Sequence, residues 1–436
     1  MSPTRNQIRS LMDRPVAVFG AGVTGNAVEA FLNGMGVETV FYDERPHLSG
    51  ESVNDFMAAP SHLHRLVVCS PGFSRQHEWL KAARRQGMTV IGDLDLGYLF
   101  WPGKILAVTG TNGKSTTALL LERALAHAGL DARACGNIGT PLVHLVESAD
   151  PECWAVVEVS SFQCELMESF RCDAALWTNF DEDHIDRHGG LVPYFEAKAR
   201  LFEMRRNSRS KAWVGPSVEE TRKREDLCLK EPYEVVPVRP ESVEDLDPAC
   251  PFRFLPQAEN FCLVSAFWKD FGFPREALVE AANELEMLPH RLEAVASEDG
   301  VTYWNDSKAT NFAATLAALQ RFEQKVYWIG GGRAKGGDLQ RFVRELAPRI
   351  GQAFVLGETA PPLRKALVQE GVKAEVFESL ESAVRTAHRV ARGPGDVVFS
   401  PGFASFDDWK NYAERGDAFR RLVREHLSIK STTLPT

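Results

Sequence analysis

Short apolar runs that alternate with helical patterns organise the first hundred residues. Runs typical of buried strands lie at residues 15–20 (PVAVFG), 37–43 (VETVFYD), 65–72 (RLVVCSPG) and 88–93 (MTVIGD). A helical stretch that reaches about Asn33 follows the first run, and a helix rich in Ala, Arg and Lys precedes the last. Strands that alternate with helices predict a parallel sheet that is covered on both faces.

The same alternation starts again twice. A second series begins at Lys104 and contains KILAV, WAVVEV, AALWTNF and the amphipathic stretch PYFEAKARLFEM. A third series follows His290 and contains VTYWNDS, a helix from Asn311, KVYWIGGG, QAFVLG, KAEVFE, DVVFSPG and a last helix near 417–426. Each series has the composition of one α/β domain.

The length of the chain agrees with several domains. A chain of 436 residues exceeds what one hydrophobic core usually organises. We expect three consecutive α/β domains, at residues 1–94, 95–290 and 291–436. The charged stretch 205–254 shows no clear periodicity, and we interpret it as a variable part of the middle domain.

Composition and charge narrow the classes of function. A formal net charge of −9 argues against a broad nucleic-acid-binding surface, although it permits a local basic pocket. No apolar run approaches the roughly 18 residues that a membrane helix needs, and the N-terminus lacks the apolar core of a signal peptide. The eight cysteines show no C-x-x-C pair and no zinc-finger spacing, which indicates reduced thiols. We therefore expect a cytoplasmic protein that is not inserted in a membrane.

The first glycine-rich turn, GAGVTG, follows the first predicted strand. Gly20, Gly22 and Gly25 have G-x-G-x-x-G spacing, and Asp43 ends the next strand. This pattern is typical of a dinucleotide site, where amides at a helix N-terminus face a pyrophosphate. The pattern alone fits NAD, which would make the chain a dehydrogenase, or a nucleotide-diphosphate sugar. It also fits a tight turn that binds nothing.

A second glycine loop, TGTNGKST, follows the strand KILAV. It is shorter than the common P-loop, since only two residues separate Gly110 from Gly113. Amides of the loop and of the helix that starts near Lys114 are expected to face an anion. Lys114 would neutralise phosphate oxygens, and Ser115 or Thr116 would reach Mg²⁺. ATP is the ligand that this loop predicts.

Acidic residues and histidines follow two strands of the same predicted sheet. Glu158 ends the strand WAVVEV, and NFDEDHIDRHGG follows the strand AALWTNF. Carboxylates and single histidines without cysteine spacing suit Mg²⁺ better than Zn²⁺. We predict metal binding for Glu158 and His184 and interpret the other acids of the loop as surface charge.

Six stretches together resemble the Mur ligase family, the ATP-dependent amide-forming enzymes of peptidoglycan precursor synthesis. They are GTNGKST, EVSSFQ, NFDEDHIDRH, PYFEAKARLF, LPHRLE and NDSKATN. Within the family, NDSKATN, GGRAKGGD and SPGFASFDDWKNYAERGDAF are similar to the members that add glutamate to UDP-N-acetylmuramoyl-L-alanine. The resemblance implies a Rossmann-like UDP-binding domain, a P-loop ATPase-like central domain and a Rossmann-like C-terminal domain that binds the amino acid. The first glycine turn is then a UDP site and not an NAD site.

The resemblance also implies a mechanism and the residues that perform it. The substrate carboxylate attacks the γ-phosphate of ATP to give an acyl phosphate, and the amine of glutamate then displaces phosphate. Catalysis is assigned to Lys114, Glu158, His184 and Lys198. Two Mg²⁺ ions are assigned to Ser115, Glu158, His184 and Lys198, with a carbamate on Lys198. ATP contacts are assigned to Gly110, Thr111, Asn112, Gly113, Lys114, Ser115, Thr116, Asn260, Arg291, Asp306 and Lys308.

Substrate contacts are implied in the same way. The UDP pocket is assigned to Val23, Thr24, Asp43, Glu44, Ser70, Pro71 and Gly72. The muramoyl-alanine end is assigned to Asn137, Gln163 and His184. The glutamate pocket is assigned to Thr310, Lys335, Ser405 and Tyr412, and these positions favour D-glutamate with L-glutamate as the alternative. We expect a monomer.

The sequence departs from the family pattern at two places. ENFCL keeps Asn260 but has Glu259 and Leu263 where the family has histidine and a second asparagine, which loosens the expected adenine contacts. GGRAKGGD has Ala334 where an acidic residue is common. Other members of the superfamily, such as folylpolyglutamate synthase or a ligase that adds a diamino acid, remain alternatives, as does an inactive nucleotide-binding regulatory protein.

Overall fold

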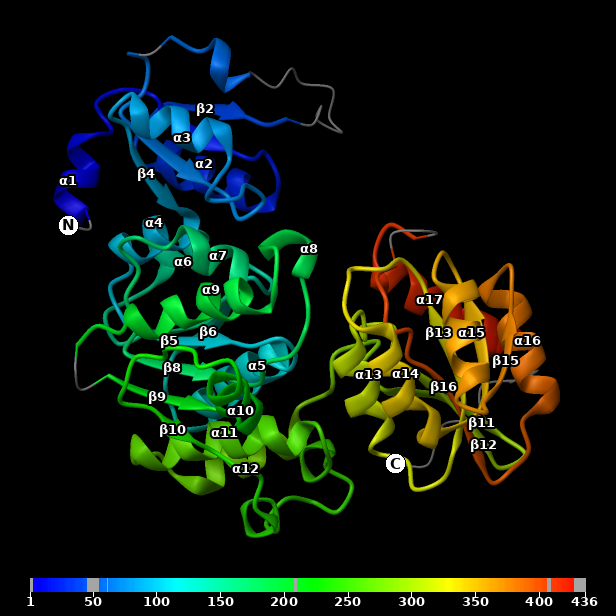
Figure 1. Cartoon of the computed structure of the whole chain (residues 1–436). Coiled ribbons are helices and arrows are strands. Elements are labelled where there is room, and N and C mark those ends of the chain that lie inside the picture. The colour runs from blue at the N-terminus through cyan, green and yellow to red at the C-terminus, as the bar shows by residue number, and fades with distance from the viewer. Residues whose placement is uncertain (1–2, 45–54, 61, 208–209, 406–408, 427–436) are drawn as a thin grey trace. The chain divides into compact units, whose positions relative to one another are not determined.

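The computed structural model divides into two compact units (Figure 1). It describes all residues except 1–2, 45–54, 61, 208–209, 406–408 and 427–436. Unit 1 comprises Met1–Phe180, Val192–Leu246 and Glu259–Leu285, and unit 2 comprises Asp181–Leu191, Asp247–Ala258 and Glu286–Thr436. Within the described residues, no helix is long and apolar enough to cross a membrane.

Unit 1 begins with a four-stranded parallel sheet of order β2-β1-β3-β4. Its strands are β1 (Val16–Phe19), β2 (Thr39–Tyr42), β3 (Leu66–Cys69) and β4 (Thr89–Gly92), with α1 (Arg5–Ser10), α2 (Val23–Gly34), α3 (Glu78–Arg85) and α4 (Asp93–Phe100). Alternate residues of a strand point to opposite faces. Val16 and Val18 therefore join one core with Leu32, whereas Ala17 and Phe19 join a second core with Trp79.

The second sheet of unit 1 has six parallel strands in the order β10-β9-β8-β5-β7-β6. Its strands are β5 (Lys104–Thr109), β6 (Ala132–Gly136), β7 (Trp154–Glu158), β8 (Ala174–Trp177), β9 (Lys211–Val214) and β10 (Glu234–Val235). Its helices are α5 (Lys114–His127), α6 (Leu142–Leu145), α7 (Ser161–Leu166), α9 (Leu191–Glu203), α10 (Pro216–Arg224), α11 (Gln257–Asp270) and α12 (Arg275–Glu284). The stretch 205–254 thus adds β9, the edge strand β10 and a helix, which its sequence pattern did not predict.

Unit 2 contains a six-stranded sheet of order β11-β12-β16-β13-β14-β15. Its strands are β11 (Glu293–Glu298), β12 (Val301–Asn305), β13 (Val326–Gly331), β14 (Ile350–Leu356), β15 (Lys373–Val376) and β16 (Gly395–Phe399). Only the β11–β12 pair is antiparallel among the pairings described. The helices are α8 (Ile185–His188), α13 (Phe312–Leu319), α14 (Leu339–Leu346), α15 (Ala360–Gln369), α16 (Leu380–Val390) and α17 (Tyr412–His426).

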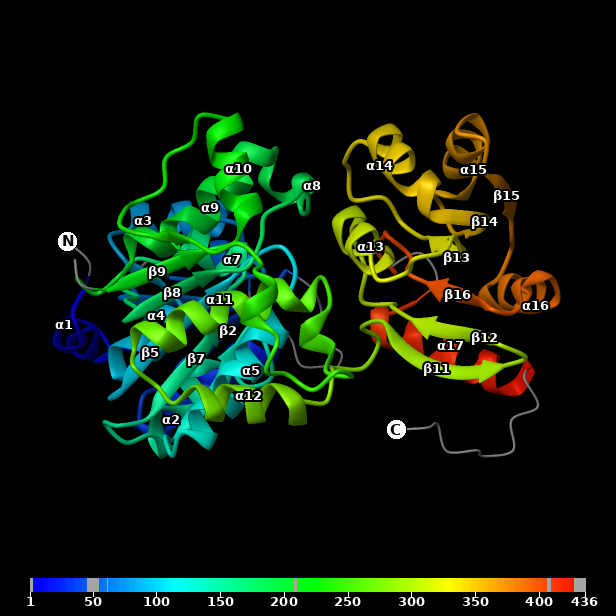
Figure 2. The same ribbon diagram turned by 90° about the horizontal axis from the view of Figure 1, so that it is seen from below.

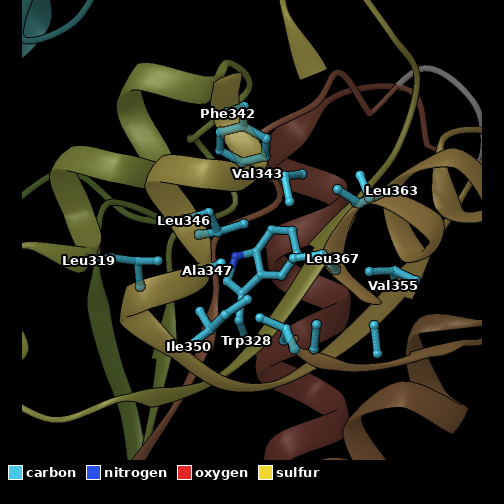
Figure 3. Packing of buried hydrophobic residues seen from close by; sticks show 14 of the residues in the cluster. Leu319, Trp328, Phe342, Val343, Leu346, Ala347, Ile350, Val355, Leu363 and Leu367 are labelled. Atoms are coloured by element: carbon cyan, nitrogen blue, oxygen red, sulfur yellow. The ribbon is translucent and has the colours of Figure 1, made fainter. Parts of the chain in front are cut away.

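Helices cover both faces of this sheet. Helix α17 runs along β11 and β12 (Figure 2), where Phe419 and Val423 pack with Tyr303. On the other face, Trp328 of β13 lies among apolar side chains of α14 and α15, including Phe342 (Figure 3). The last helix begins at Tyr412, five residues before the predicted start. The predicted fold class, three consecutive α/β domains, is confirmed, whereas the exact domain boundaries stay a prediction.

Candidate active site

The short glycine loop joins β5 to α5 through backbone conformations that only glycine adopts readily. Gly110 has φ +152° and Gly113 has φ +81°, and α5 begins at Lys114 as predicted. A Cβ atom on Gly110 would lie 1.9 Å from Thr178 Oγ1, and one on Gly113 would lie 2.4 Å from Asn260 Oδ1. The loop is therefore packed closely on both sides, and its amides lie at the start of a 14-residue helix.

Two lysine side chains converge on this loop. Lys114 Nζ donates to the carbonyl oxygens of Gly110 and Thr111, both at 2.9 Å. Lys198 Nζ, from α9, donates to the same Gly110 oxygen at 2.8 Å, and its side chain is 1% exposed. The Lys198 ammonium also lies 4.9 Å from the centre of the Tyr194 ring. Two ammonium groups are thus held against the carbonyl oxygens of the loop, which concentrates positive charge beside it.

Glu158, at the end of β7, has a buried carboxylate, and one of its two oxygens accepts no hydrogen bond from the residues that the structure describes. Its side chain is 2% exposed, and Oε1 accepts a hydrogen bond of 2.8 Å from Asn137 Nδ2. Within the described part of the chain, the buried Oε2 atom has no hydrogen-bond partner, and neither has Thr116 Oγ1. Burial of an unpaired carboxylate oxygen costs free energy, so these groups fit a site for a hard cation. No group of three or more His, Cys, Asp or Glu side chains suited to a metal ion occurs among the described residues.

The first glycine turn has the expected backbone, but its side chains differ from those around the phosphate loop. Gly20 has φ +94°, and a Cβ atom on Gly25 would lie 1.9 Å from the Gly20 carbonyl oxygen. Asp43 Oδ2 accepts a hydrogen bond of 3.0 Å from the amide of Ala21. Ser70 Oγ donates to the Phe19 carbonyl at 2.7 Å. The side chain that meets the amides of this turn is therefore a carboxylate.

Other predicted substrate residues lie around the first sheet and after β7. The side chain of Val23 is 74% exposed at the start of α2, and Glu44 forms an ion pair with His77 at 3.0 Å. Gln163 is 3% exposed, and its Nε2 atom donates to Asp93 Oδ2 at 3.2 Å. Burial raises the pKa of Asp93 to about 6, against the effect of that hydrogen bond. The roles predicted for these residues stay predictions.

Unit 2 contains residues predicted to face ATP, Asp306 and Lys308, and residues predicted to bind glutamate, Ser405 and Tyr412. Burial raises the pKa of Asp306 to about 7, although Ser400 Oγ donates to its Oδ2 atom at 2.7 Å. Lys308 Nζ lies 3.9 Å from the centre of the Tyr412 ring. Ser405 is 2% exposed in the turn after β16. Asp306 and Lys308 follow β12, Ser405 follows β16, and these two strands are hydrogen-bonded neighbours.

A cleft in unit 2 is lined by two of the residues predicted to bind glutamate. Thr310 and Lys335 line it, together with Glu182, Asp183, Ile185, Asn311, Phe312, Gly336, Gly337, Gly402 and Phe403. Asp183 Oδ2 accepts from Asn311 Nδ2 at 3.0 Å, and Lys335 Nζ lies 3.5 Å from Asp183 Oδ1. The interpretation of Asp183 as surface charge is therefore wrong.

The charge of Asp183 is stabilised inside this cleft. Its side chain is 8% exposed, and burial by itself raises its pKa. The positive charge of Lys335, the neighbouring His184 and the hydrogen bond from Asn311 outweigh burial, so the net pKa lies below the ordinary value. The cleft therefore contains an ionised acid beside an ammonium group.

The two units separate the predicted metal ligands. Ser115, Glu158 and Lys198 belong to unit 1, whereas His184 belongs to unit 2. Pairing of His184 with the other three stays a prediction. Sequence patterns also missed Thr178, whose hydroxyl donates to the Asn112 carbonyl at 2.6 Å and thereby supports the phosphate loop. The place of Thr178 directly after a strand of the same sheet was the available signal.

Comparisons with known proteins agree with this arrangement. Residues 108–216 match the Mur ligase middle domain, and residues 290–402 match the Mur ligase, glutamate ligase domain. The chain is 35% identical to the UDP-N-acetylmuramoylalanine–D-glutamate ligase of Pelotomaculum thermopropionicum, over 97% of this chain and 99% of the relative. It is 35% identical to the ligase of the same name from Gloeobacter violaceus, over 94% and 98%.

A solved structure gives the same picture of the fold. The MurF ligase of Thermotoga maritima, in complex with ADP, superposes with a TM-score of 0.58 at 14% identity, over 96% of this chain and 99% of that chain. At this identity the likeness concerns the fold alone. Two matched domain models and relatives of this identity over nearly the whole length show that the chain belongs to the Mur ligase family, in the group of the UDP-N-acetylmuramoylalanine–D-glutamate ligases.

Proposed function

We propose that this chain uses ATP to join D-glutamate to UDP-N-acetylmuramoyl-L-alanine in the synthesis of peptidoglycan precursors. The observation that supports this most strongly is the 35% identity, over 97% of the chain, to a ligase named for that reaction. The ammonium group of Lys114, which lies against the glycine loop, supports the assignment of this loop to the phosphates of ATP. We further propose that the enzyme acts in the cytoplasm as a monomer.

The reaction requires activation of a carboxylate, because an unactivated carboxylate is a poor acyl donor to an amine. A carboxylate oxygen of the UDP-linked substrate attacks the γ-phosphorus of ATP, and the bond to ADP breaks. The amine of glutamate then attacks the carbonyl carbon of the acyl phosphate. Phosphate leaves, the nitrogen loses a proton and an amide remains. Both steps accumulate negative charge, which the Lys114 ammonium is placed to stabilise.

The two nucleotides are assigned to different glycine turns of unit 1. The loop from Gly110 to Thr116, with Asn260 against Gly113, binds the phosphates of ATP. Arg291, Asp306 and Lys308 of unit 2 serve the same nucleotide. The turn from Gly20 to Gly25, with Asp43 and Ser70, binds the UDP group. Asn137 and Gln163 serve the muramoyl-alanine end.

Ser115, Glu158, His184 and a carbamate on Lys198 would hold two Mg²⁺ ions. When bound, Mg²⁺ supplies a Lewis acid that neutralises phosphate oxygens. The unpartnered Glu158 Oε2 atom supports this assignment from the chain itself. The position of Lys198, buried beside the phosphate loop, supports the carbamate assignment.

The amino acid is assigned to unit 2. Thr310 and Lys335 in the cleft hold one carboxylate, and Ser405 with the Tyr412 backbone holds the other. Anchors at both carboxylates leave one enantiomer able to present its amine to the acyl phosphate. A misplacement of the nitrogen by about 1 Å could cost on the order of a hundredfold in rate.

Release of ADP in the presence of a panel of amino acids tests the proposal. We expect release only when UDP-N-acetylmuramoyl-L-alanine, Mg²⁺ and D-glutamate are all present, with kcat/KM for L-glutamate lower by at least about a hundredfold. Turnover of folate substrates, or no turnover of the muramoyl nucleotide, would overturn the assignment. A preference for L-glutamate would keep the ligase chemistry and overturn its stereochemistry.

A further inference from the structure

A buried acid that the mechanism above does not use lies at the start of α4. The side chain of Asp93 is 4% exposed, and its Oδ2 atom accepts a hydrogen bond of 3.2 Å from Gln163 Nε2. Asp93 directly follows β4 of the first sheet, whereas Gln163 belongs to α7, which follows β7 of the second sheet. The hydrogen bond therefore joins the sheet assigned to UDP to a residue assigned to the muramoyl-alanine end.

The orientation of the Gln163 side-chain amide is determined by its two neighbours. The backbone amide of Ser160 can only donate, and it donates to Gln163 Oε1 at 3.1 Å. An ionised carboxylate can only accept, so Asp93 requires the Nε2 end of the same side chain. Burial raises the pKa of Asp93 to about 6, which leaves the carboxyl mostly ionised at neutral pH. Both neighbours thus favour one orientation, with the amide oxygen toward Ser160 and the amide nitrogen toward Asp93.

This orientation decides what Gln163 can offer to a substrate. Its Oε1 atom already accepts two hydrogen bonds, from the backbone amide and from the hydroxyl of Ser160, both at 3.1 Å. Its Nε2 atom carries two hydrogens, and Asp93 accepts one of them. Gln163 in this orientation therefore presents an N–H donor, which suits an oxygen acceptor on the substrate. A reversed amide would present an oxygen atom and repel the same group.

A second acid of α4 holds Asp93 at a fixed place beside Gln163. Asp95 is fully buried, and its carboxylate accepts hydrogen bonds of 2.7–3.1 Å from the backbone amides of residues 168–170. These bonds fasten the start of α4 to the segment that follows α7. Asp95 thus bonds to main-chain groups and has an architectural role, whereas Asp93 bonds to a side chain.

We propose that Asp93 is a positioning residue that holds Gln163 as a hydrogen-bond donor toward the muramoyl-alanine end of the substrate. This rests on the proposed function and adds to it a residue that acts on the substrate only through Gln163. Loss of the Asp93 carboxylate leaves the amide free to turn. A fraction of the enzyme then presents the amide oxygen to an oxygen of the substrate, and binding weakens.

Two other roles for Asp93 make a different prediction. If Asp93 only supported α4, its removal would weaken substrate binding whether or not Gln163 is present. Direct contact between Asp93 and the substrate would have the same result. Action through Gln163 predicts that the effect of removing Asp93 disappears once the Gln163 side chain is absent, so a double-mutant cycle separates the roles.

The first experiment measures this cycle with Asp93→Ala, Gln163→Ala and the double variant. The KM for UDP-N-acetylmuramoyl-L-alanine is determined with saturating ATP, Mg²⁺ and D-glutamate. We expect each single substitution to raise this KM on the order of tenfold, and the double variant to stay within about twofold of Gln163→Ala. The kcat and the KM for ATP should change by less than about threefold, because the phosphate loop is untouched.

Equal fold-changes of Asp93→Ala in both backgrounds, or an unchanged KM in Gln163→Ala, would overturn the proposal. Absence of turnover of this substrate by the unmodified enzyme would instead contradict the proposed function.

The second experiment repeats the cycle with Asp93→Asn, which keeps the size of the side chain and one acceptor oxygen. We expect a smaller rise in the KM than in Asp93→Ala, and again less than about twofold in the Gln163→Ala background. Asp95→Asn is the matched architectural control, and it should lower the melting temperature while its effect on the KM is the same in both backgrounds. Coupling of Asp95 to Gln163 as large as that of Asp93 would show general damage to α4 and contradict the positioning role.

Discussion

The two glycine turns of unit 1 share a backbone plan and differ in charge. Each connects a buried parallel strand to a helix, with positive φ at Gly20 in the first turn and at Gly110 and Gly113 in the second. In the first turn the amide of Ala21 is met by the carboxylate of Asp43. In the second turn the Gly110 carbonyl is met by the ammonium groups of Lys114 and Lys198. Glycine spacing thus determines how closely a ligand approaches, whereas the side chains around it determine which ligand binds.

Removal of Lys114 should give the largest effect and should act on the second turn alone. In Lys114→Ala we expect kcat/KM for ATP to fall on the order of a thousandfold, because the ammonium that faces the transferred phosphate is lost. Steady-state kinetics measure this. The control is Lys104→Ala, because Lys104 is an exposed lysine at the start of β5, and this variant should keep nearly full activity. If Lys114→Ala lowered kcat/KM for ATP only slightly, the proposed difference in charge between the two turns would not explain which ligand each binds.

Removal of the Lys198 side chain should cause the second-largest loss of activity, and an added carboxylic acid should restore part of that activity. In Lys198→Ala we expect activity to fall on the order of a hundredfold. A short carboxylic acid added to the assay should restore part of it, because it replaces the oxygens of the proposed carbamate. Mass spectrometry and activity as a function of acid concentration check this. Full loss without rescue at any concentration would argue that Lys198 acts as an ammonium and not as a carbamate.

Gly25→Ala should damage the first turn and spare the second. The added Cβ would lie 1.9 Å from the Gly20 carbonyl oxygen, so we expect a loss of about 1–3 kcal/mol in the free energy of unfolding. The KM for the UDP substrate should rise while the KM for ATP stays constant. Gly22→Ala is the matched control, because φ at Gly22 is −86° and no heavy atom lies within 4 Å of the added Cβ. Equal effects of the two substitutions on the KM for the UDP substrate would show that the backbone packing of this turn does not matter for binding.

Asp43→Ala should give the smallest effect of the four. It leaves the amide of Ala21 without its carboxylate partner, which costs about 1–2 kcal/mol of stability. We expect a several-fold rise in the KM for the UDP substrate and no change for ATP. Thermal unfolding and steady-state kinetics measure the two effects. A rise in the KM for ATP would contradict the assignment of Asp43 to the UDP group.

Local sequence patterns predicted the elements that carry both turns. The start of α5 at Lys114 follows from a glycine, a lysine and a helix-forming run. The strands β9 and β10 escaped prediction because they lie within a charged stretch that shows no clear apolar periodicity. The start of α17 was predicted five residues late, because the polar residues before Asp417 gave little apolar periodicity.

The candidate site was predictable only where a motif was local. The phosphate loop and Glu158 each follow a strand directly, so their positions could be inferred from the chain order. Asp183 was interpreted as surface charge, because its partners Asn311 and Lys335 are 128 and 152 residues away. The local sequence pattern does not indicate that the polar loop that carries Asp183 packs against residues that are more than a hundred positions away in the chain.

Amide hydrogen exchange of the two turns tests the central claim most directly. ATP with Mg²⁺ should slow exchange in residues 110–116 by about tenfold or more and leave residues 20–25 unchanged, because only the ligand's own turn is protected. UDP-N-acetylmuramoyl-L-alanine should protect residues 20–25 and leave the other loop unchanged. Protection of the first turn by NAD(H), or protection of the same turn by both substrates, would contradict the assignment of the two nucleotides.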